Sequence, residues 1–162
     1  MKTVVISALV PIACVGIIAM PAAATAETKL SAMVTLQGAC KKLVVGGKVR
    51  TSECTGKLLN TEYSDGRLGF YFVTADGSML TFSTRGNEQV KADENTRVVP
   101  VDMVLPTAKG KTEKISAVGT CKFTNPYQGI PAPVECAADT ARGRYEAAFL
   151  SDGSKPDAKT FD

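Results

Sequence analysis

Alternation of apolar and polar residues predicts β-strands along most of the chain. The clearest case is a pair of runs, residues 67–74 and 79–84, on either side of an Asp76-Gly77 turn. Asp-Gly between two β-rich runs is a strong signal for a hairpin. Alternation places one set of apolar side chains on a single face of this hairpin, where they should form the core: Leu68, Phe70, Phe72, Leu80 and Phe82. The opposite face is only partly polar, which is typical of a sheet covered on one side.

Similar runs recur about every 8–12 residues, with turn residues between them. Further strands are expected at residues 30–36, 56–62, 97–105, 112–123 and 143–150. Pro100 limits its strand to a sheet edge or a bulge, because proline has no N–H to donate. Residues 139–142 allow one helical turn, and no longer segment has helical periodicity. The pattern therefore predicts an all-β domain, an antiparallel sandwich or barrel of about 8–10 short strands with little or no helix apart from the N-terminal segment.

Residues 1–26 have the three parts of a bacterial-type export signal. Lys2 precedes an apolar run over residues 4–20, and Ala24-Thr25-Ala26 matches the A-x-A cleavage pattern. We expect cleavage between Ala26 and Glu27, which leaves residues 27–162 as a single domain in the periplasm or outside the cell. An uncleaved membrane helix is the alternative, although the run is close to the lower length limit for a span. No transmembrane segment is expected after removal of the signal.

The cysteines indicate two disulfide-stapled hairpins. Cleavage removes Cys14 and leaves four cysteines: Cys40, Cys54, Cys121 and Cys136. An even number behind an export signal predicts disulfides, because the compartment beyond the membrane is oxidising. A three-residue loop at residues 46–48 would place Cys40 opposite Cys54, and facing Cys121 with Cys136 would pair Lys122 with Glu135. We expect these two bonds, each worth about 3 kcal/mol in the chain-entropy model, with pairing between the hairpins as the alternative.

The two hairpins also share a local sequence. Both read G-x-C-K and, 11 or 12 residues later, E-C; each is followed by a phenylalanine and an Asp-Gly-Ser turn. We interpret this as a weak duplication of residues 30–84 and 112–154, against the alternative of two unrelated hairpins with similar turns. The tail, residues 152–162, is expected to be flexible.

The composition of the chain argues against several classes of function. The chain has 19 Lys+Arg and 16 Asp+Glu, and loss of Lys2 with the signal lowers its net charge from +3 to +2. This near-neutral balance does not favour nucleic acid as a partner. The chain has no histidine, which removes the commonest general base and metal ligand. It also lacks G-x-S-x-G and S-x-x-K motifs and a glycine-rich phosphate loop. We expect no enzyme activity, no cofactor and no metal.

Two charged stretches receive structural interpretations. Residues 85–97 mix both signs and lack the ligand spacing of a calcium loop, which favours a solvated connection over a cation site. Lys109, Lys111 and Lys114 have no interleaved aromatic residues, so they are interpreted as lysines that protect a sheet edge from aggregation.

The loop at residues 125–133 is the best candidate for recognition. Three prolines stiffen it, so little entropy is lost on binding. Its candidate contact residues are Asn125, Tyr127, Gln128 and Ile130. The alternative is that Tyr127 and Ile130 fold back over the end of the core. We expect a binding or envelope-associated structural protein whose partner is a protein, a small molecule or a glycan. A small carboxylate-dependent hydrolase and an inhibitor of an extracellular enzyme are the other hypotheses.

Overall fold

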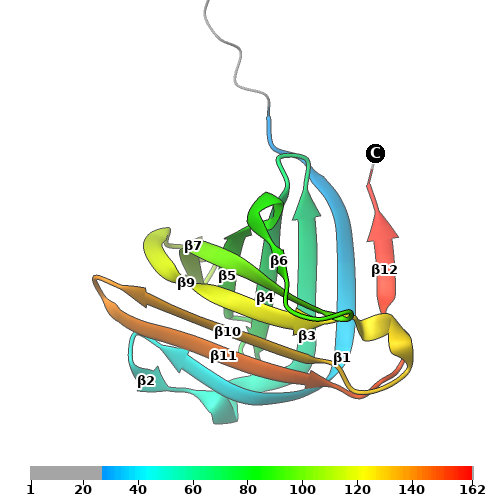
Figure 1. Cartoon of the computed structure of the whole chain (residues 1–162). Coiled ribbons are helices and arrows are strands. Elements are labelled where there is room, and N and C mark those ends of the chain that lie inside the picture. Colours follow the sequence, from blue (N-terminus) through cyan, green and yellow to red (C-terminus); the bar gives the residue numbers. More distant parts are fainter. Residues whose placement is uncertain (1–26, 162) are drawn as a thin grey trace, which may run out of the picture.

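Each long strand pairs with the next one along the chain, and the last returns to pair with the first (Figure 1). The computed structural model describes residues 27–161, so the expected signal lies outside the described residues. The result is a closed antiparallel barrel of eight strands. In order they are β1 (Leu30–Val45), β3 (Cys54–Tyr63), β4 (Arg67–Thr74), β5 (Met79–Arg85), β7 (Thr96–Ala108), β9 (Ile115–Thr124), β10 (Pro133–Thr140) and β11 (Gly143–Ser151).

Short elements complete the chain. Four further strands pair with β1 or β7: β2 (Lys48–Val49), β6 (Val90–Lys91), β8 (Lys111–Thr112) and β12 (Asp157–Thr160). Three 3-10 turns follow strands: η1 (Thr51–Glu53), η2 (Gly86–Glu88) and η3 (Pro126–Gln128). The all-β prediction is confirmed, in its barrel form. Within residues 27–161, no helix is long and apolar enough to span a membrane.

Strand β1 closes the barrel because it bends and serves two neighbours. Residues 30–37 pair with β3, whereas residues 38–44 pair with β11. At the bend, Gly38 lies opposite Ser151. A Cβ atom on Gly38 would meet the carbonyl oxygen of Leu150 and lie 2.7 Å from the Cα of Ser151, inside any normal contact. Glycine therefore allows β1 and β11 to approach where the barrel closes.

The β4–β5 hairpin supplies the centre of the core, as predicted. Phe70 faces Phe82 and Phe72 faces Leu80 across the ladder, and all four side chains are buried. The rings of Phe72 and Phe82 meet edge to face, with centroids 5.9 Å apart. Leu68 is only partly buried. Alternate residues of the other strands fill the rest of the interior, as expected for a barrel of this size.

Two bulges change which residues of a strand point inward. One lies between Cys40 and Lys42 of β1, and the other leaves Asp102 of β7 without a partner in either neighbouring ladder. In β7 the buried apolar positions are therefore Val99 and Val101 before the bulge, and Val104 after it. The predicted bulge near Pro100 is present. The strand is not an edge, however, because β5 and β9 pair with its two sides.

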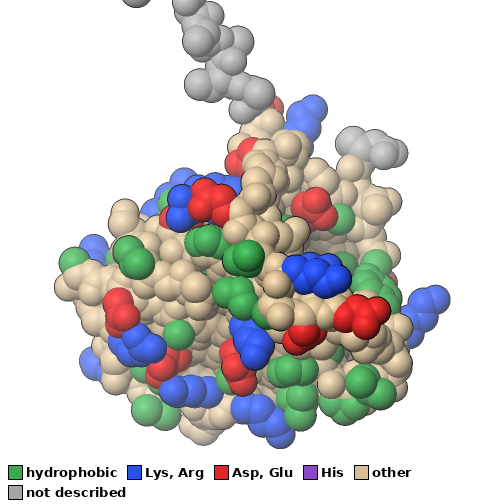
Figure 2. Space-filling model, viewed as in Figure 1, with side chains coloured by type: hydrophobic (Ala, Val, Ile, Leu, Met, Phe, Trp, Pro, Cys, Tyr) green, Lys and Arg blue, Asp and Glu red, His purple; other side chains and the backbone are tan. Residues whose placement is uncertain are grey.

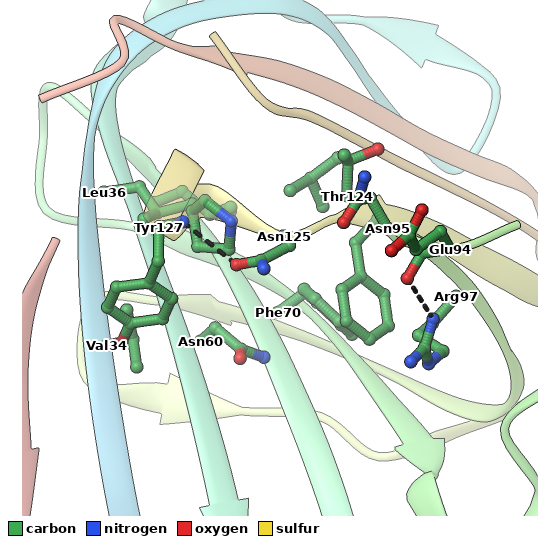
Figure 3. Close-up of a pocket in the computed structure, with 14 residues that line it drawn as sticks. Val34, Leu36, Asn60, Phe70, Glu94, Asn95, Arg97, Thr124, Asn125 and Tyr127 are labelled. Carbon is green, nitrogen blue, oxygen red and sulfur yellow. Dashed lines mark hydrogen bonds between the residues drawn. The ribbon is translucent and has the colours of Figure 1, made fainter. Parts of the chain in front are cut away.

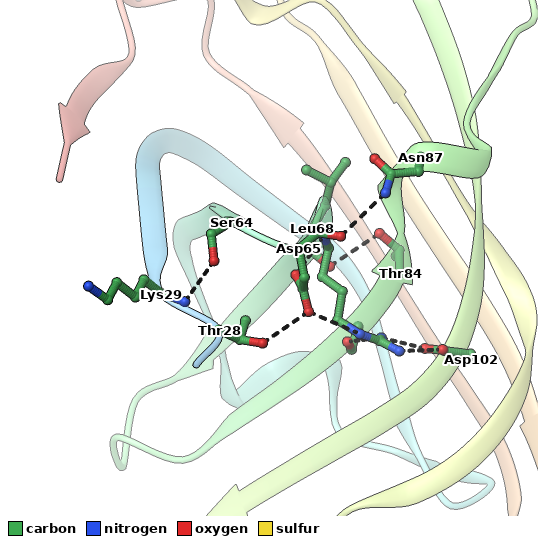
Figure 4. Close-up of polar contacts among 10 residues, drawn as sticks. Thr28, Lys29, Ser64, Asp65, Leu68, Thr84, Asn87 and Asp102 are labelled. Atoms are coloured by element: carbon green, nitrogen blue, oxygen red, sulfur yellow. Dashed lines mark hydrogen bonds and ion pairs between the residues drawn. The ribbon is translucent and has the colours of Figure 1, made fainter. Parts of the chain in front are cut away.

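An ion pair holds this bulge in place (Figure 4). The guanidinium of Arg67 donates to both carboxylate oxygens of Asp102, at 2.8 and 2.6 Å, and to the hydroxyl of Ser83 at 3.0 Å. Arg67 lies at the start of β4, so the contact joins the β3–β4 turn to β7 across β5. The hydrogen bond from Arg67 lowers the pKa of Asp102.

Both predicted disulfides are present, Cys40–Cys54 and Cys121–Cys136. The second lies in the expected register, with Lys122 opposite Glu135.

The expected register of the first hairpin is wrong. Gly46 and Gly47, both with positive φ, form a two-residue turn that pairs Val44 with Val49 instead of Arg50. Pairing stops after two residues and η1 follows, so the disulfide joins β1 to the beginning of β3 rather than facing residues of a ladder. The two stapled hairpins are thus built differently, and their duplication stays a prediction.

The flexibility of the tail, residues 152–162, stays a prediction. Within the tail, β12 pairs with residues 32–35 of β1 through the backbone, a contact that apolar periodicity does not indicate. One smaller expectation differs from the structure. Residues 139–142 form no helical turn, because Asp139 and Thr140 continue β10 and a tight turn leads directly into β11.

Replacing Gly38 with Ala tests the closure of the barrel. The added methyl group meets backbone that cannot rotate away, so we expect the free energy of unfolding to fall by about 1–3 kcal/mol. Urea denaturation measures this change. The exposed neighbour Gln37, replaced by Ala, is the control and should leave stability nearly unchanged. Equal stability of the two variants would contradict the close approach.

Replacing Asp102 with Asn tests the ion pair. Because the folded pKa of Asp102 is lower than its unfolded value, the pair stabilises the protein above about pH 4 and the effect is lost as pH falls through the folded pKa. We expect a loss of about 1 kcal/mol at pH 7, since both side chains are partly exposed. Denaturation measured at pH 7 and at pH 2.5 gives the free energy of unfolding of both proteins. The difference between Asp102→Asn and the unchanged protein should be smaller at pH 2.5.

Candidate functional site

One end of the barrel opens into a pocket of about 310 Å³, here called the mouth pocket (Figure 3). Its floor consists of apolar side chains that point into the barrel: Val34, Leu36, Leu58, Phe70, Phe123 and Val134. The rings of Phe70 and Phe123 contact each other, with centroids 5.2 Å apart and planes tilted by 49°. The floor is therefore continuous with the buried core.

The opposite end of the barrel is nearly closed, with a small depression of about 50 Å³ beside Leu43 and Leu80. Leu43, Leu80, Ile115 and Tyr145 are buried there. The β1–β2 turn covers this end as well, because the N–H of Gly47 donates to the carbonyl of Arg144 at 2.8 Å. A ligand of the barrel interior would consequently enter at the mouth pocket.

The loop between β6 and β7 builds one side of the rim. The carboxylate of Asp93 accepts hydrogen bonds from the backbone N–H of Asn95 at 2.9 Å and of Thr96 at 2.8 Å. These bonds, led by that from Asn95, lower the pKa of Asp93. They fix the loop conformation that brings Asn95 and Glu94 to the pocket.

Turn η3 builds the facing side and is tied to the same loop. The side-chain oxygen of Asn125 accepts from the N–H of Tyr127 at 3.0 Å, which caps the turn. The backbone N–H of Asn125 donates to the backbone carbonyl of Asn95 at 2.9 Å. The side-chain amide of Gln128 donates to the side-chain oxygen of Asn95 at 2.7 Å. Asn95 thus joins the two rim loops through backbone and side chain.

Two of the four candidate contact residues line the mouth pocket, and the other two lie outside its lining. Asn125 and Tyr127 line the mouth pocket, and the ring of Tyr127 lies beside Val34 (Figure 3). Gln128 is outside the lining and acts through Asn95. Ile130 is also outside it and is 57% exposed. Tyr127 overhangs the end of the core yet keeps 56% of its surface exposed, so features of both sequence-based interpretations are present.

Sequence reasoning missed the part of the rim contributed by residues 94–97 and Asn60. The interpretation of residues 85–97 as a solvated loop fits the exposed residues 91–94, but Arg97 lies within the barrel strand β7 and its side chain lines the pocket. A signal was present. Arg97 is in phase with the inward residues Val99 and Val101, so alternation extended backward would have pointed it into the barrel.

A second depression, of about 440 Å³, lies on the outer surface of the barrel across β4, β5 and β7. It is larger than the mouth pocket, but the main polar groups around it already have partners. The hydroxyls of Tyr63 and Tyr71 are 2.7 Å apart, and Arg67 is bound to Asp102. Burial, followed by the hydrogen bond with Tyr63, raises the pKa of Tyr71 to about 12. We therefore take the mouth pocket as the candidate site.

The lining of the mouth pocket is mainly apolar and carries few ionisable groups. One acidic side chain, Glu94, and one basic side chain, Arg97, are part of its lining. Within residues 27–161, no three acidic or cysteine side chains are grouped to hold a metal ion. On the face seen in Figure 2, side chains of both charges are interspersed, with no extended patch of one sign.

Fold and site together define a small β-barrel with an apolar pocket at one open end. Comparison with protein-family models, with curated proteins and with solved structures gave no match.

Proposed function

We propose that this protein binds a small, largely apolar molecule in the mouth pocket. The observation that carries the proposal is the continuity of the pocket floor with the barrel core. Leu58, Phe70 and Val134 are among the most buried side chains of the protein, yet they border an opening to solvent. An eight-stranded barrel can hold one small ligand where side chains leave space, and a pocket volume of about 310 Å³ is at the lower end for ligand sites.

The fixed rim supports this proposal. Asp93 holds one rim loop through two backbone N–H groups, and Asn95 connects that loop to η3. A rim that is already ordered loses little conformational entropy when a ligand binds. Tyr127 and the amide of Asn125 can then contact a ligand without rearrangement of the backbone.

The alternatives receive less support. A carboxylate-dependent hydrolase needs two placed carboxyl groups, and only Glu94 supplies one to this pocket. An inhibitor or a protein-binding module would use residues 125–133 as a projecting loop. Gln128 and Asn125 instead hold the beginning of that loop against Asn95, on the barrel.

The proposal includes export. Both disulfides indicate an oxidising compartment, and residues 1–26 have the pattern of a cleavable signal. We propose that the protein works in the periplasm or outside the cell.

Export predicts a defined N-terminus. Mass spectrometry of the protein recovered outside the cytoplasm should show a chain that begins at Glu27 and carries no free thiol. Replacing Ala24 and Ala26 with Gln should block cleavage, because signal peptidase sites accept small residues there. A cytoplasmic chain that keeps residues 1–26 and reduced cysteines would contradict export.

Ligand binding is tested with the neutral fluorescent probe N-phenyl-1-naphthylamine, which brightens in apolar surroundings. We expect saturable binding by the unchanged protein. Val34→Phe should weaken it by about tenfold or more, because the larger side chain fills the pocket. Tyr127→Ala should weaken binding with little change in melting temperature, because Tyr127 is half exposed.

Ile130→Ala is the matched control. Ile130 lies in the same loop and is as exposed as Tyr127, but it is not part of the pocket lining. Its replacement should leave probe binding unchanged. Absence of binding, or equal binding by the Val34→Phe variant, would refute the proposed function. A large drop in melting temperature for Tyr127→Ala would assign that residue to the core instead.

A further inference from the structure

Arg97 differs from every other arginine of the chain. The sequence contains six arginines, and five of them form ion pairs: Arg50–Glu53, Arg67–Asp102, Arg85–Glu88, Arg142–Glu113, and Arg144 with Asp139 and Glu146. Arg97 forms none with any carboxylate of residues 27–161. It is also the arginine that lines the mouth pocket.

The strand places this guanidinium at the pocket wall. Arg97 lies opposite Phe123 in the β7–β9 ladder, and both side chains line the pocket. Its Nη1 atom donates only to backbone carbonyls, those of Asp93 and Thr96 at 3.3 Å and that of Glu94 at 3.4 Å. These long contacts orient the group through one nitrogen. The guanidinium therefore retains N–H donors that can serve a ligand.

The surrounding charges leave room for an anion. The carboxylate of Asp93 is already bound by two backbone N–H groups. Glu94 is the one acidic residue in the lining, and it is exposed on the rim loop. The amide of Asn125 adds donor groups nearby, and the amide of Asn60 already donates to the carbonyl of Gly69 at 3.1 Å. The N–H donors of Arg97 and Asn125 consequently face one acidic side chain, Glu94, around an apolar floor.

We propose that the mouth pocket selects a carboxylic acid with an apolar body. The carboxylate contacts the guanidinium of Arg97, and the apolar body lies against Phe70 and Phe123. This inference rests on the proposed function, because it names the class of ligand that the same pocket accepts. A guanidinium matches a carboxylate in geometry and charge, and such a hydrogen bond is stronger at a partly buried site than in water.

The test compares decanoate with methyl decanoate, which has the same chain without the charge. Each is titrated against the protein loaded with N-phenyl-1-naphthylamine, at a pH near 7 and below micelle-forming concentrations. The unchanged protein should release the probe at decanoate concentrations about tenfold lower than for the ester. Arg97→Met should abolish this preference while keeping probe binding, and Arg97→Lys should keep part of it.

Two further variants separate a direct contact from a general effect of charge. Lys122→Met removes a positive charge from the outside of the same end of the barrel, next to Arg97 in the ladder but outside the pocket lining. It should leave the preference for decanoate unchanged. Glu94→Gln removes the acidic residue of the lining and should tighten decanoate binding a few-fold without affecting the ester.

The outcomes distinguish the two proposals. Probe binding with equal displacement by acid and ester overturns the ligand class and leaves the apolar pocket in place. A preference that survives in Arg97→Met overturns the role of Arg97. If the probe does not bind at all, the proposed function itself fails. If Arg97→Met does not fold, the Arg97→Lys and Glu94→Gln variants test the role of charge at this position. Each is expected to change the decanoate concentration that releases the probe, and to leave the methyl decanoate concentration unchanged.

Discussion

Closure of the sheet between β1 and β11 is the constraint on which the rest of the structure depends. A closed barrel leaves no free edge among its eight strands, and here β1 changes partners along one edge, from β12 to β11, to complete the circle. The change occurs at Gly38, where the backbones of β1 and β11 are too close for a side chain. The part of β1 before this bend pairs with β12 instead of β11, and this part carries Val34 and Leu36.

The mouth pocket is a consequence of this geometry and of the bulges. At the nearly closed end, large side chains and the β1–β2 turn fill the barrel. At the open end, Asn95 joins two loops over an interior that Phe70 and Phe123 only partly fill. The bulge at Asp102 shifts the inward face of β7 by one residue. Odd-numbered residues such as Arg97 therefore face inward before the bulge, and Val104 faces inward after it. Arg67 holds that bulge from outside the barrel.

Much of the fold could be predicted because its signals are local. The Asp76-Gly77 turn and the alternating phenylalanines define the β4–β5 hairpin and its inward face. The register of Cys121 and Cys136 follows from the pairs beside them. Where local signals compete, prediction was less successful. Two adjacent glycines suit a two-residue turn as well as a three-residue loop, and the structure uses the former.

The sequence by itself determined the β-class, the inward face of the central hairpin, the two disulfides and a proline-rich loop with Tyr127, because each depends on neighbours along the chain. Only the tertiary structure decided that the strands close into a barrel, that β12 joins β1, and that Asn60, Asn95 and Arg97 meet Tyr127 around one pocket. Those residues come from separate strands and loops. Their proximity arises from strand order, bend and bulge, which are set by contacts between distant segments and leave no pattern within any one of them.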